Sequence, residues 1–293
     1  MKIRPKHLNE GDTVGVIALS NPFDMKILES QLKIFTDMGL RYKLGQTIGR
    51  QRGYLAGSDE ERVRDFHQMI EDPEVKAIFC VSDGYGAARI ADKIDYPLLE
   101  EHPKIFWGFS DITFLHIAIQ QYADVVTFHG PSLTTIADDR SKKMLYQLFA
   151  PYEIYYDESL SQLEGIVPGA VRAEIIGGNL SRIVDTLGTK FEIDVRGKIL
   201  LLEEDRLGIE ELDRMLNQLR LAGKLKEASG FAIGSFGDGD MLPLFKEYLW
   251  PYKKPAVVGF HIGHSTPNIG IPLGVEAILD ADEKVLRLLP GVE

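Results

Sequence analysis

The chain has 293 residues, of which 44% are hydrophobic and 26% are charged, and its formal net charge is −11. This length suits two domains, and the negative charge disfavours binding to nucleic acid or to an anionic membrane surface. The single cysteine, Cys80, lies in an apolar run and is expected to be a small core residue. No apolar run reaches the length of a membrane span, and no apolar segment of a signal peptide follows the charged amino terminus. We therefore expect a soluble, cytoplasmic protein that binds neither nucleic acid nor membrane.

Strand and helix patterns alternate through the first half of the chain. A capping box, Ser58 with Glu61 three residues later, marks the start of one helix. The expected strands are short apolar runs, at Thr13–Leu19, Val75–Val81, Lys104–Phe109 and Val125–His129. Strands that alternate with helices indicate βαβ units, so residues 1–155 are predicted to form an α/β domain with a mostly parallel sheet.

An acidic, loop-like segment, Tyr156–Ala170, separates this domain from a second domain that is expected to cover residues 170–293. Further strands are predicted at Val171–Ile176, Lys198–Leu202, Phe231–Phe236 and Ala256–Phe260. Alternating apolar residues around Asp280–Lys284 predict a closing hairpin. The second domain is therefore expected to be rich in strands.

Ser110 lies where one predicted strand turns sharply into a helix. The apolar run Ile105–Phe109 ends at Ser110-Asp111, and Ile112 and Leu115 then begin a helical pattern. The carboxyl ends of strands in an open α/β sheet hold ligands and catalytic groups, and a helix start offers backbone N–H groups that can stabilise an oxyanion. Ser110 is thus a candidate nucleophile. The alternative is that Ser110 or Asp111 only caps the helix.

Two further polar residues follow predicted strands and could complete a catalytic triad with Ser110. Glu203 follows Ile199–Leu202, and His264 lies just beyond Val257–Phe260. A serine hydroxyl needs a base to take its proton, and the base needs a partner that orients it. The rivals for these two roles are other acids and histidines nearby, namely Glu204, Asp205, His129 and His261. No G-x-S-x-G motif is present, so an ordinary α/β-hydrolase is not indicated.

Two other sites are conceivable from the pattern. His261 and His264, with His129 and the acids at 203–205, could bind a metal, but H-x-x-H outside a helix, without a known spacing to a third ligand, is a weak signal. Gly84-Tyr85-Gly86 follows a strand as a dinucleotide motif does, yet Arg89 stands where the last glycine is needed. These glycines are better explained by a tight turn or by backbone N–H groups that approach a ligand.

Taken together, these residues resemble the murein tetrapeptide LD-carboxypeptidases and their relatives, the microcin C self-immunity peptidases. The resemblance covers nearly the whole chain. The blocks that carry it are Gly11–Gly15, Tyr54–Ser58 with Arg62, Asp72–Ile78, Gly84-Tyr85-Gly86 with Arg89, Pro103–Ile105, Gly108–Thr113, His129-Gly130-Pro131, Gly177–Leu180, Leu202-Glu203, Asp213–Leu216, Gly263-His264 and Pro272–Gly274.

The resemblance implies a cofactor-independent serine peptidase without a metal, with Ser110 as nucleophile, His264 as base and Glu203 as its partner. The backbone N–H groups of Asp111 and Gly84 would form the oxyanion hole. The implied fold pairs a flavodoxin-like amino-terminal domain, which carries the nucleophile, with a smaller, β-rich carboxyl-terminal domain, and the implied assembly is a homodimer. We further expect three residues to contact the substrate, Tyr85, Gly86 and His129.

The chain departs from the family pattern in two places. The family usually has Arg-Gly-Gly-Tyr-Gly where this chain has Ser82-Asp83-Gly84-Tyr85-Gly86, so Asp83 adds a negative charge near the expected oxyanion hole. The family often has Tyr-Arg after the catalytic glutamate, where this chain has Glu210-Glu211. The second departure affects substrate contacts.

The expected activity is hydrolysis of an L-to-D amide bond, with release of the terminal D-Ala from a muropeptide tetrapeptide. The pocket should then present a cation or backbone N–H groups to the substrate's carboxylate. One alternative is an aminoacyl-nucleotide amide hydrolase of the microcin type, which would need an aromatic shelf such as Trp107 or Tyr85. The other is a two-domain protein that binds a small ligand without turnover.

Overall fold

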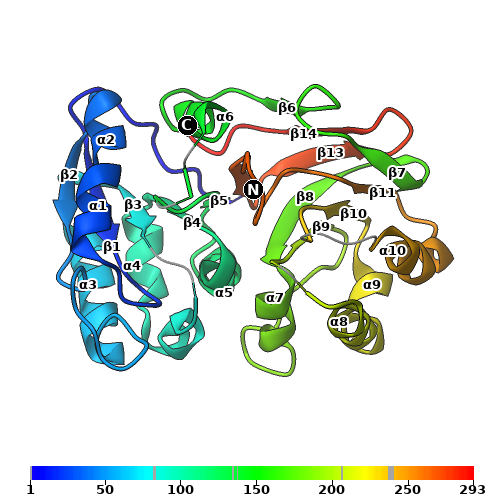
Figure 1. Ribbon diagram of the computed structural model, residues 1–293, viewed down its shortest axis with the longest axis horizontal. Helices are drawn as coiled ribbons and strands as arrows, with labels where there is room; N and C mark the ends of the chain where they lie inside the picture. Colours follow the sequence, from blue (N-terminus) through cyan, green and yellow to red (C-terminus); the bar gives the residue numbers. More distant parts are fainter. Residues whose placement is uncertain (1, 82–83, 134, 137, 206, 237–240) are drawn as a thin grey trace.

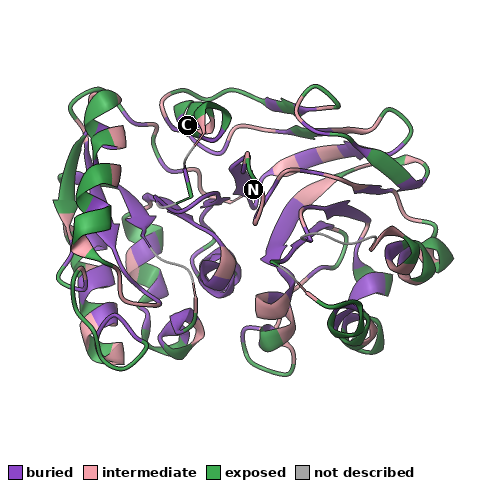
Figure 2. Cartoon of the chain, viewed as in Figure 1, coloured by how far each residue is buried: buried purple, intermediate pink, exposed green. Residues whose placement is uncertain are grey.

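The structure, a computed structural model, describes residues 2–81, 84–133, 135–136, 138–205, 207–236 and 241–293. Its strands form two sheets that lie side by side, one built mainly from the amino-terminal half of the chain and one from the carboxyl-terminal half (Figure 1). The strands of both sheets are largely buried, whereas the outer faces of the surrounding helices are exposed (Figure 2). This arrangement confirms the predicted α/β class and the β-rich second domain.

The first sheet has six strands in the order β12-β5-β4-β3-β1-β2. Its strands are β1 (Thr13–Ile17), β2 (Arg41–Leu44), β3 (Val75–Cys80), β4 (Ile105–Gly108), β5 (Thr127–His129) and β12 (Ile271–Leu273). β1 to β5 are parallel, and their order is that of a flavodoxin-like sheet. β12 pairs with β5 in the antiparallel direction.

Helices cover both faces of the first sheet. α1 (Met25–Gln31) and α2 (Lys33–Asp37) pack on one face. α3 (Asp59–Glu71), α4 (Tyr96–Glu101) and α5 (Thr113–Tyr122) pack on the other. The predicted capping box is confirmed, since the Ser58 hydroxyl accepts from the Glu61 N–H and the Glu61 carboxylate accepts from the Ser58 N–H. Short 3₁₀ helices complete this half of the chain, at η1 (Ala87–Arg89), η2 (Ala91–Lys93), η3 (Ser110–Ile112) and η4 (Met144–Leu148).

The second sheet has eight strands in the order β6-β14-β13-β8-β9-β10-β11-β7. Its strands are β6 (Ile154–Tyr156), β7 (Glu164–Val167), β8 (Ala170–Asn179), β9 (Ile199–Glu203), β10 (Gly230–Ile233), β11 (Ala256–Val258), β13 (Glu276–Asp280) and β14 (Val285–Leu288). β8 to β11 are parallel, so this sheet has a carboxyl edge of its own. β13 and β14 form the predicted hairpin.

Four helices follow or join the strands of the second domain, and α6 (Asp139–Lys143) precedes it. They are α7 (Leu180–Thr186), α8 (Ile209–Leu221), α9 (Lys224–Glu227) and α10 (Leu242–Leu249), with the 3₁₀ helix η5 (Trp250–Tyr252). Their apolar residues and those of β9 and β10 form one core. A larger core runs continuously from the first sheet to the second, and α5 contacts both β8 and α7. The carboxyl ends of β4 and β9 therefore meet at the boundary between the two sheets.

The two sheets interleave along the chain more than the expected ranges, 1–155 and 170–293, imply. β6 and β7 lie before residue 170 but belong to the second sheet, and β12 lies far beyond residue 170 but belongs to the first. β7 lies within the segment that we expected to be a loop. Throughout the ranges that the structure describes, no helix combines the length and apolar character needed to cross a membrane.

Candidate active site

Ser110 stands at a tight turn between β4 and α5, as the sequence predicted. Its φ is 56°, a left-handed value that costs a non-glycine residue about 1–3 kcal/mol. No side-chain capping bond is present at this helix start, so the capping alternative is not supported for Ser110. A strained serine between a buried strand and a helix is the arrangement that exposes a nucleophile at the edge of an α/β sheet.

A buried histidine fixes the strand side of this turn. His116 is fully buried on α5, and its Nε2 lies 2.8 Å from the carbonyl oxygen of Gly108. Because a carbonyl only accepts, Nε2 carries the proton. Burial lowers the pKa of His116 to about 3, so the ring is neutral. The sequence analysis did not single out His116, because its position on the buried face of α5 looks like that of any core residue.

The side chain of Asp111 supports the loop beside the turn rather than a helix end. Its Oδ2 accepts from the Ser20 hydroxyl at 2.6 Å and from the Ala87 N–H at 2.8 Å. Burial raises the pKa of this carboxyl group. Since Ala87 begins η1 just after Gly84 and Tyr85, Asp111 ties the glycine-containing loop to the turn that carries Ser110.

Glu203 and His264 form the pair that the sequence predicted. Glu203 ends β9 and is fully buried, and its Oε2 accepts from the His264 ring Nδ1 at 2.8 Å and from the His264 backbone N–H at 3.2 Å. Because the carboxylate can only accept, Nδ1 carries a proton and the neutral ring has a lone pair on Nε2. His264 is therefore oriented as a general base requires.

Burial and the contact between Glu203 and His264 shift the pKa values of both residues. Burial lowers the pKa of His264, but the hydrogen bond and the charge of Glu203 outweigh burial and raise this pKa above its usual range. Burial raises the pKa of Glu203, yet contacts with His129 and His264 hold it below its usual range. Glu203 is thus a carboxylate at neutral pH, and it stabilises the protonated form of His264.

Gly263 makes the contact between Glu203 and His264 possible. Its φ is +94°, and a Cβ at this position would come within 2.0 Å of the Glu203 Oε2. Gly178 has a similar role at the end of β8, where its φ is +129° and a Cβ would lie 2.7 Å from the Thr113 Oγ1. The latter close approach lets the Thr113 hydroxyl accept the Asn179 N–H across the boundary between the two sheets, at 3.0 Å.

One cavity of about 440 Å³ collects the predicted residues from both domains. Ser110 and His264 both line it, and the ring of Phe109, the residue before Ser110, lies 4.9 Å from the His264 ring. Gly84 and Tyr85 line the same cavity, and Tyr85 is 61% exposed. The remaining described lining residues are Asn179, Ser181, Arg182, Glu204, Asp205, Leu207 and Glu211.

Two of the three residues expected to contact the substrate, His129 and Gly86, are buried, and so is Trp107, one of the two residues considered as an aromatic shelf. His129 is fully buried, with its Nε2 3.5 Å from the Glu203 Oε1, so it lies behind the Glu203–His264 pair rather than on the cavity wall. Gly86 is buried, and its carbonyl accepts from the buried Arg62 side chain at 2.8 Å. Trp107 is fully buried and donates to the Pro131 carbonyl, so it cannot serve as a shelf for a base.

Glu204 and His261, two of the rivals for the acid and base roles, are held in other ways. Glu204 accepts from the Asn179 side chain at 2.7 Å and from the Ser181 N–H at 2.9 Å, and so holds the start of α7. His261 is held through its backbone N–H, which donates to the Tyr156 hydroxyl at 2.7 Å, and it is not among the described residues that line the cavity with Ser110. In the portion of the chain that the structure describes, no group of three His, Cys, Asp or Glu side chains is arranged to hold a metal ion. Asp83, which departs from the family pattern near the expected oxyanion hole, lies outside the described residues.

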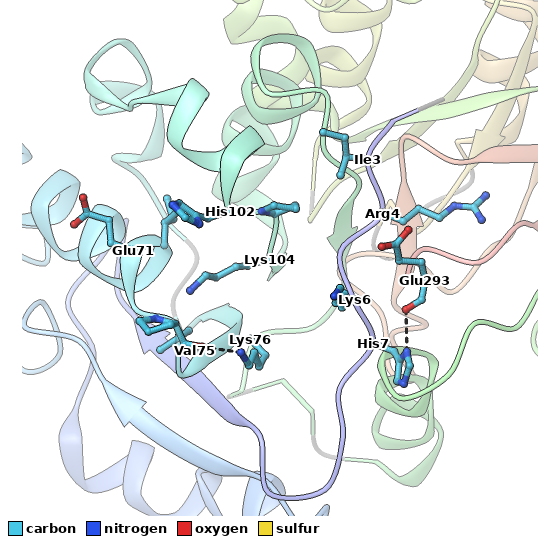
Figure 3. Close-up of a pocket in the computed structure, with 13 residues that line it drawn as sticks. Ile3, Arg4, Lys6, His7, Glu71, Val75, Lys76, His102, Lys104 and Glu293 are labelled. Atoms are coloured by element: carbon cyan, nitrogen blue, oxygen red, sulfur yellow. Dashed lines mark hydrogen bonds between the residues drawn. The ribbon is translucent and has the colours of Figure 1, made fainter.

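A second cavity, of about 420 Å³, lies at the opposite end of the first sheet (Figure 3). It is lined by basic residues near the amino ends of β3 and β4, where Lys104 donates to the carbonyls of Met69 and Asp72. Lys104 thereby satisfies carbonyl groups at the end of α3, a structural role. Since ligands of parallel sheets bind at the carboxyl ends of strands, the cavity with Ser110 is the better candidate for chemistry.

Comparison with known proteins points to one family. Residues 14–130 match the LD-carboxypeptidase N-terminal domain of peptidase family S66, and residues 172–279 match the LD-carboxypeptidase C-terminal domain. A probable murein peptide carboxypeptidase from Bacillus subtilis is 45% identical, over 100% of this chain and 96% of that protein. The microcin C7 self-immunity protein MccF from Escherichia coli is 24% identical, over 95% of this chain and 93% of that protein. The crystal structure of an MccF-like protein from Bacillus anthracis superposes with a TM-score of 0.92 at 25% identity, over 98% of this chain and 99% of that one.

Proposed function

Because the chain belongs to the LD-carboxypeptidase family, we propose that it uses a Ser110–His264–Glu203 triad to hydrolyse an L-to-D amide bond next to a free terminal carboxylate. The observation that carries this proposal is the shared cavity, in which the strained Ser110 faces the same space as His264. The hydrogen bond from His264 to the buried Glu203 supplies the orientation that a catalytic base needs.

In this mechanism His264 takes the proton of the Ser110 hydroxyl while the serine oxygen attacks the amide carbonyl. The backbone N–H groups of Asp111 and Gly84 stabilise the oxyanion that forms. The C–N bond then breaks, and His264 gives its proton to the departing amine, which leaves as the terminal amino acid. A water molecule, deprotonated by His264, hydrolyses the acyl-enzyme ester and restores the Ser110 hydroxyl. Throughout, Glu203 stabilises the imidazolium form of His264.

The substrate that we favour is a muropeptide tetrapeptide, from which the enzyme releases terminal D-Ala. Support comes from the 45% identical relative, whose name describes a murein peptide carboxypeptidase. An aminoacyl-nucleotide amide would need an aromatic shelf, and Tyr85 is the one aromatic side chain among the described residues that line the cavity. The cytoplasmic location stays a prediction from the sequence, and the homodimer stays a prediction from the resemblance.

Parallel assays of two substrates test this proposal. Purified protein is offered a tetrapeptide that ends in D-Ala and, separately, an aspartyl-adenylate sulfamide analogue, and the products are identified by mass spectrometry and by a D-Ala assay. We expect release of D-Ala from the tetrapeptide and none from Ser110→Ala. Cleavage of the sulfamide alone would make the protein a detoxifying peptidase. Binding of either compound without cleavage would instead support a non-catalytic binding protein.

A further inference from the structure

Arg182 reaches from the second domain to the turn that carries the nucleophile. It lies in the first turn of α7, and its side chain is only 16% exposed. Its Nη1 lies 3.5 Å from the Asp111 Oδ1 and 3.1 Å from the Asp185 Oδ2. Asp111 follows Ser110 directly, so the guanidinium group is held beside the reacting centre.

The guanidinium group of Arg182 also lies over the Tyr85 ring. The Arg182 Cζ lies 4.9 Å from the centre of the Tyr85 ring. Stacking of this kind stabilises a cation by about 0.5–2 kcal/mol and restricts its orientation. A guanidinium group carries five N–H donors, more than its two carboxylate contacts use. Arg182 is therefore preorganised and retains donors for a ligand.

The charges around the cavity make Arg182 the natural place for an anionic group. Of the described residues that line the cavity, Arg182 is the only lysine or arginine, while Glu204, Asp205 and Glu211 are acidic. A substrate carboxylate would be repelled by this acidic side of the cavity. It would be attracted to Arg182, whose planar fork matches the two oxygens of a carboxylate.

We propose that Arg182 binds the terminal carboxylate of the substrate and thereby restricts hydrolysis to the last amide bond of a peptide. This role rests on the proposed carboxypeptidase function and adds the residue that sets its specificity.

The test compares a tetrapeptide that ends in free D-Ala with the same peptide ending in D-alaninamide. Wild-type enzyme should favour the acid strongly. In Arg182→Gln, KM for the acid should rise about 10- to 100-fold, as expected for the loss of a charged hydrogen bond, while kcat changes less than about 3-fold. KM for the amide should stay nearly constant. Arg182→Lys should lie between the two, because it keeps the charge without the fork.

Arg196→Gln is the matched control, since Arg196 is an arginine of the same domain whose side chain is 75% exposed and bonded to Asp194. It should leave the acid-to-amide preference unchanged. An unchanged preference in Arg182→Gln would overturn the proposal. An equal fall in kcat for acid and amide would overturn it too, because it would assign Arg182 to the transition state rather than to the carboxylate.

Calorimetric binding to the inactive Ser110→Ala enzyme separates this proposal from the proposed function. The peptide acid should bind at least about 10-fold more tightly than the amide, and adding Arg182→Gln should remove that difference. This result would stand even if wild-type enzyme released no D-Ala. Equal binding of acid and amide to Ser110→Ala would refute the role of Arg182 whether or not the peptide is cleaved. If Arg182→Gln does not fold, Arg182→Lys provides the same comparison with a smaller expected effect.

Discussion

Replacing Glu203 with glutamine would remove the charge at the centre of the proposed triad and keep the shape of the side chain. Glu203 is fully buried and accepts two hydrogen bonds from His264, at 2.8 and 3.2 Å. Two unit charges about 4 Å apart attract each other by about 4 kcal/mol at an effective dielectric constant of 20. Glu203→Gln loses this attraction and the preference for a proton on Nδ1, so we expect kcat to fall by about 10³- to 10⁴-fold.

The pH dependence of kcat/KM in the same variant shows in which direction Glu203 shifts the pKa of His264. His264 must be neutral to accept the Ser110 proton, so kcat/KM rises with pH through the pKa of His264. Glu203 raises this pKa above the ordinary value of 6.5, whereas burial lowers it. In Glu203→Gln burial still lowers the pKa of His264, and only the smaller effects of the Asp205 and Glu204 charges still raise it, so the rising limb should move to lower pH.

Initial rates of D-Ala release, measured for both proteins over the pH range in which they stay folded, provide the assay. Far-ultraviolet circular dichroism at each pH confirms that the fold is retained. A rising limb at the same pH in both proteins, or a loss in kcat of less than about 10-fold, would refute the assignment of Glu203 as the partner of His264.

Three further changes test neighbouring parts of the site. Gly263→Ala places a Cβ within 2.0 Å of the Glu203 carboxylate, so kcat should fall at least about 100-fold. A rate near that of wild type would show that the loop with Gly263 and His264 can move aside. Asp111→Ala removes the acceptor of the Ser20 hydroxyl and the Ala87 N–H. The free energy of unfolding, measured with denaturant, should fall by about 3 kcal/mol. A change below about 1 kcal/mol would contradict a supporting role for Asp111. Tyr85→Ala removes the ring that lies against Arg182 and should raise KM for the tetrapeptide about 3- to 30-fold, whereas Tyr85→Phe should leave KM unchanged. An equal rise of KM in both variants would assign the contact to the hydroxyl group instead of the ring.

The sequence predicted β1, β3, β4 and β5 of the first sheet because these strands are short apolar runs, each followed by a turn or a helical pattern. It did not predict β2, which lies at the edge of the sheet, is mostly exposed and contains Arg41 and Lys43. The Ile105–Phe109 run became β4, and the turn at Ser110 appeared where the apolar run stops. β12 could not be predicted in the same way. It is only three residues long and contains Pro272, and its pairing with β5 joins segments that are far apart in the chain. Such a strand is defined by the tertiary structure rather than by local pattern.

For the site residues, too, the sequence could predict some features and not others. Ser110, Glu203 and His264 follow strands, and the family blocks singled them out, so their positions could be predicted before the structure was seen. The direction and depth of a side chain could not. His129 also ends a strand, yet it points behind Glu203 and is fully buried. Arg182 looked like an ordinary helical residue, and only the packing of α7 against the first domain brings it beside Asp111.

The most direct test of the central claim is the rate of D-Ala release by Ser110→Ala and His264→Ala, measured beside wild type on a tetrapeptide that ends in D-Ala. Both variants should stay folded, as judged by circular dichroism, and should bind the peptide. We predict that each lowers kcat by at least about 10³-fold, and that combining them costs little more, because the two residues act as one unit. Release of D-Ala by Ser110→Ala at a rate close to that of wild type would contradict the account.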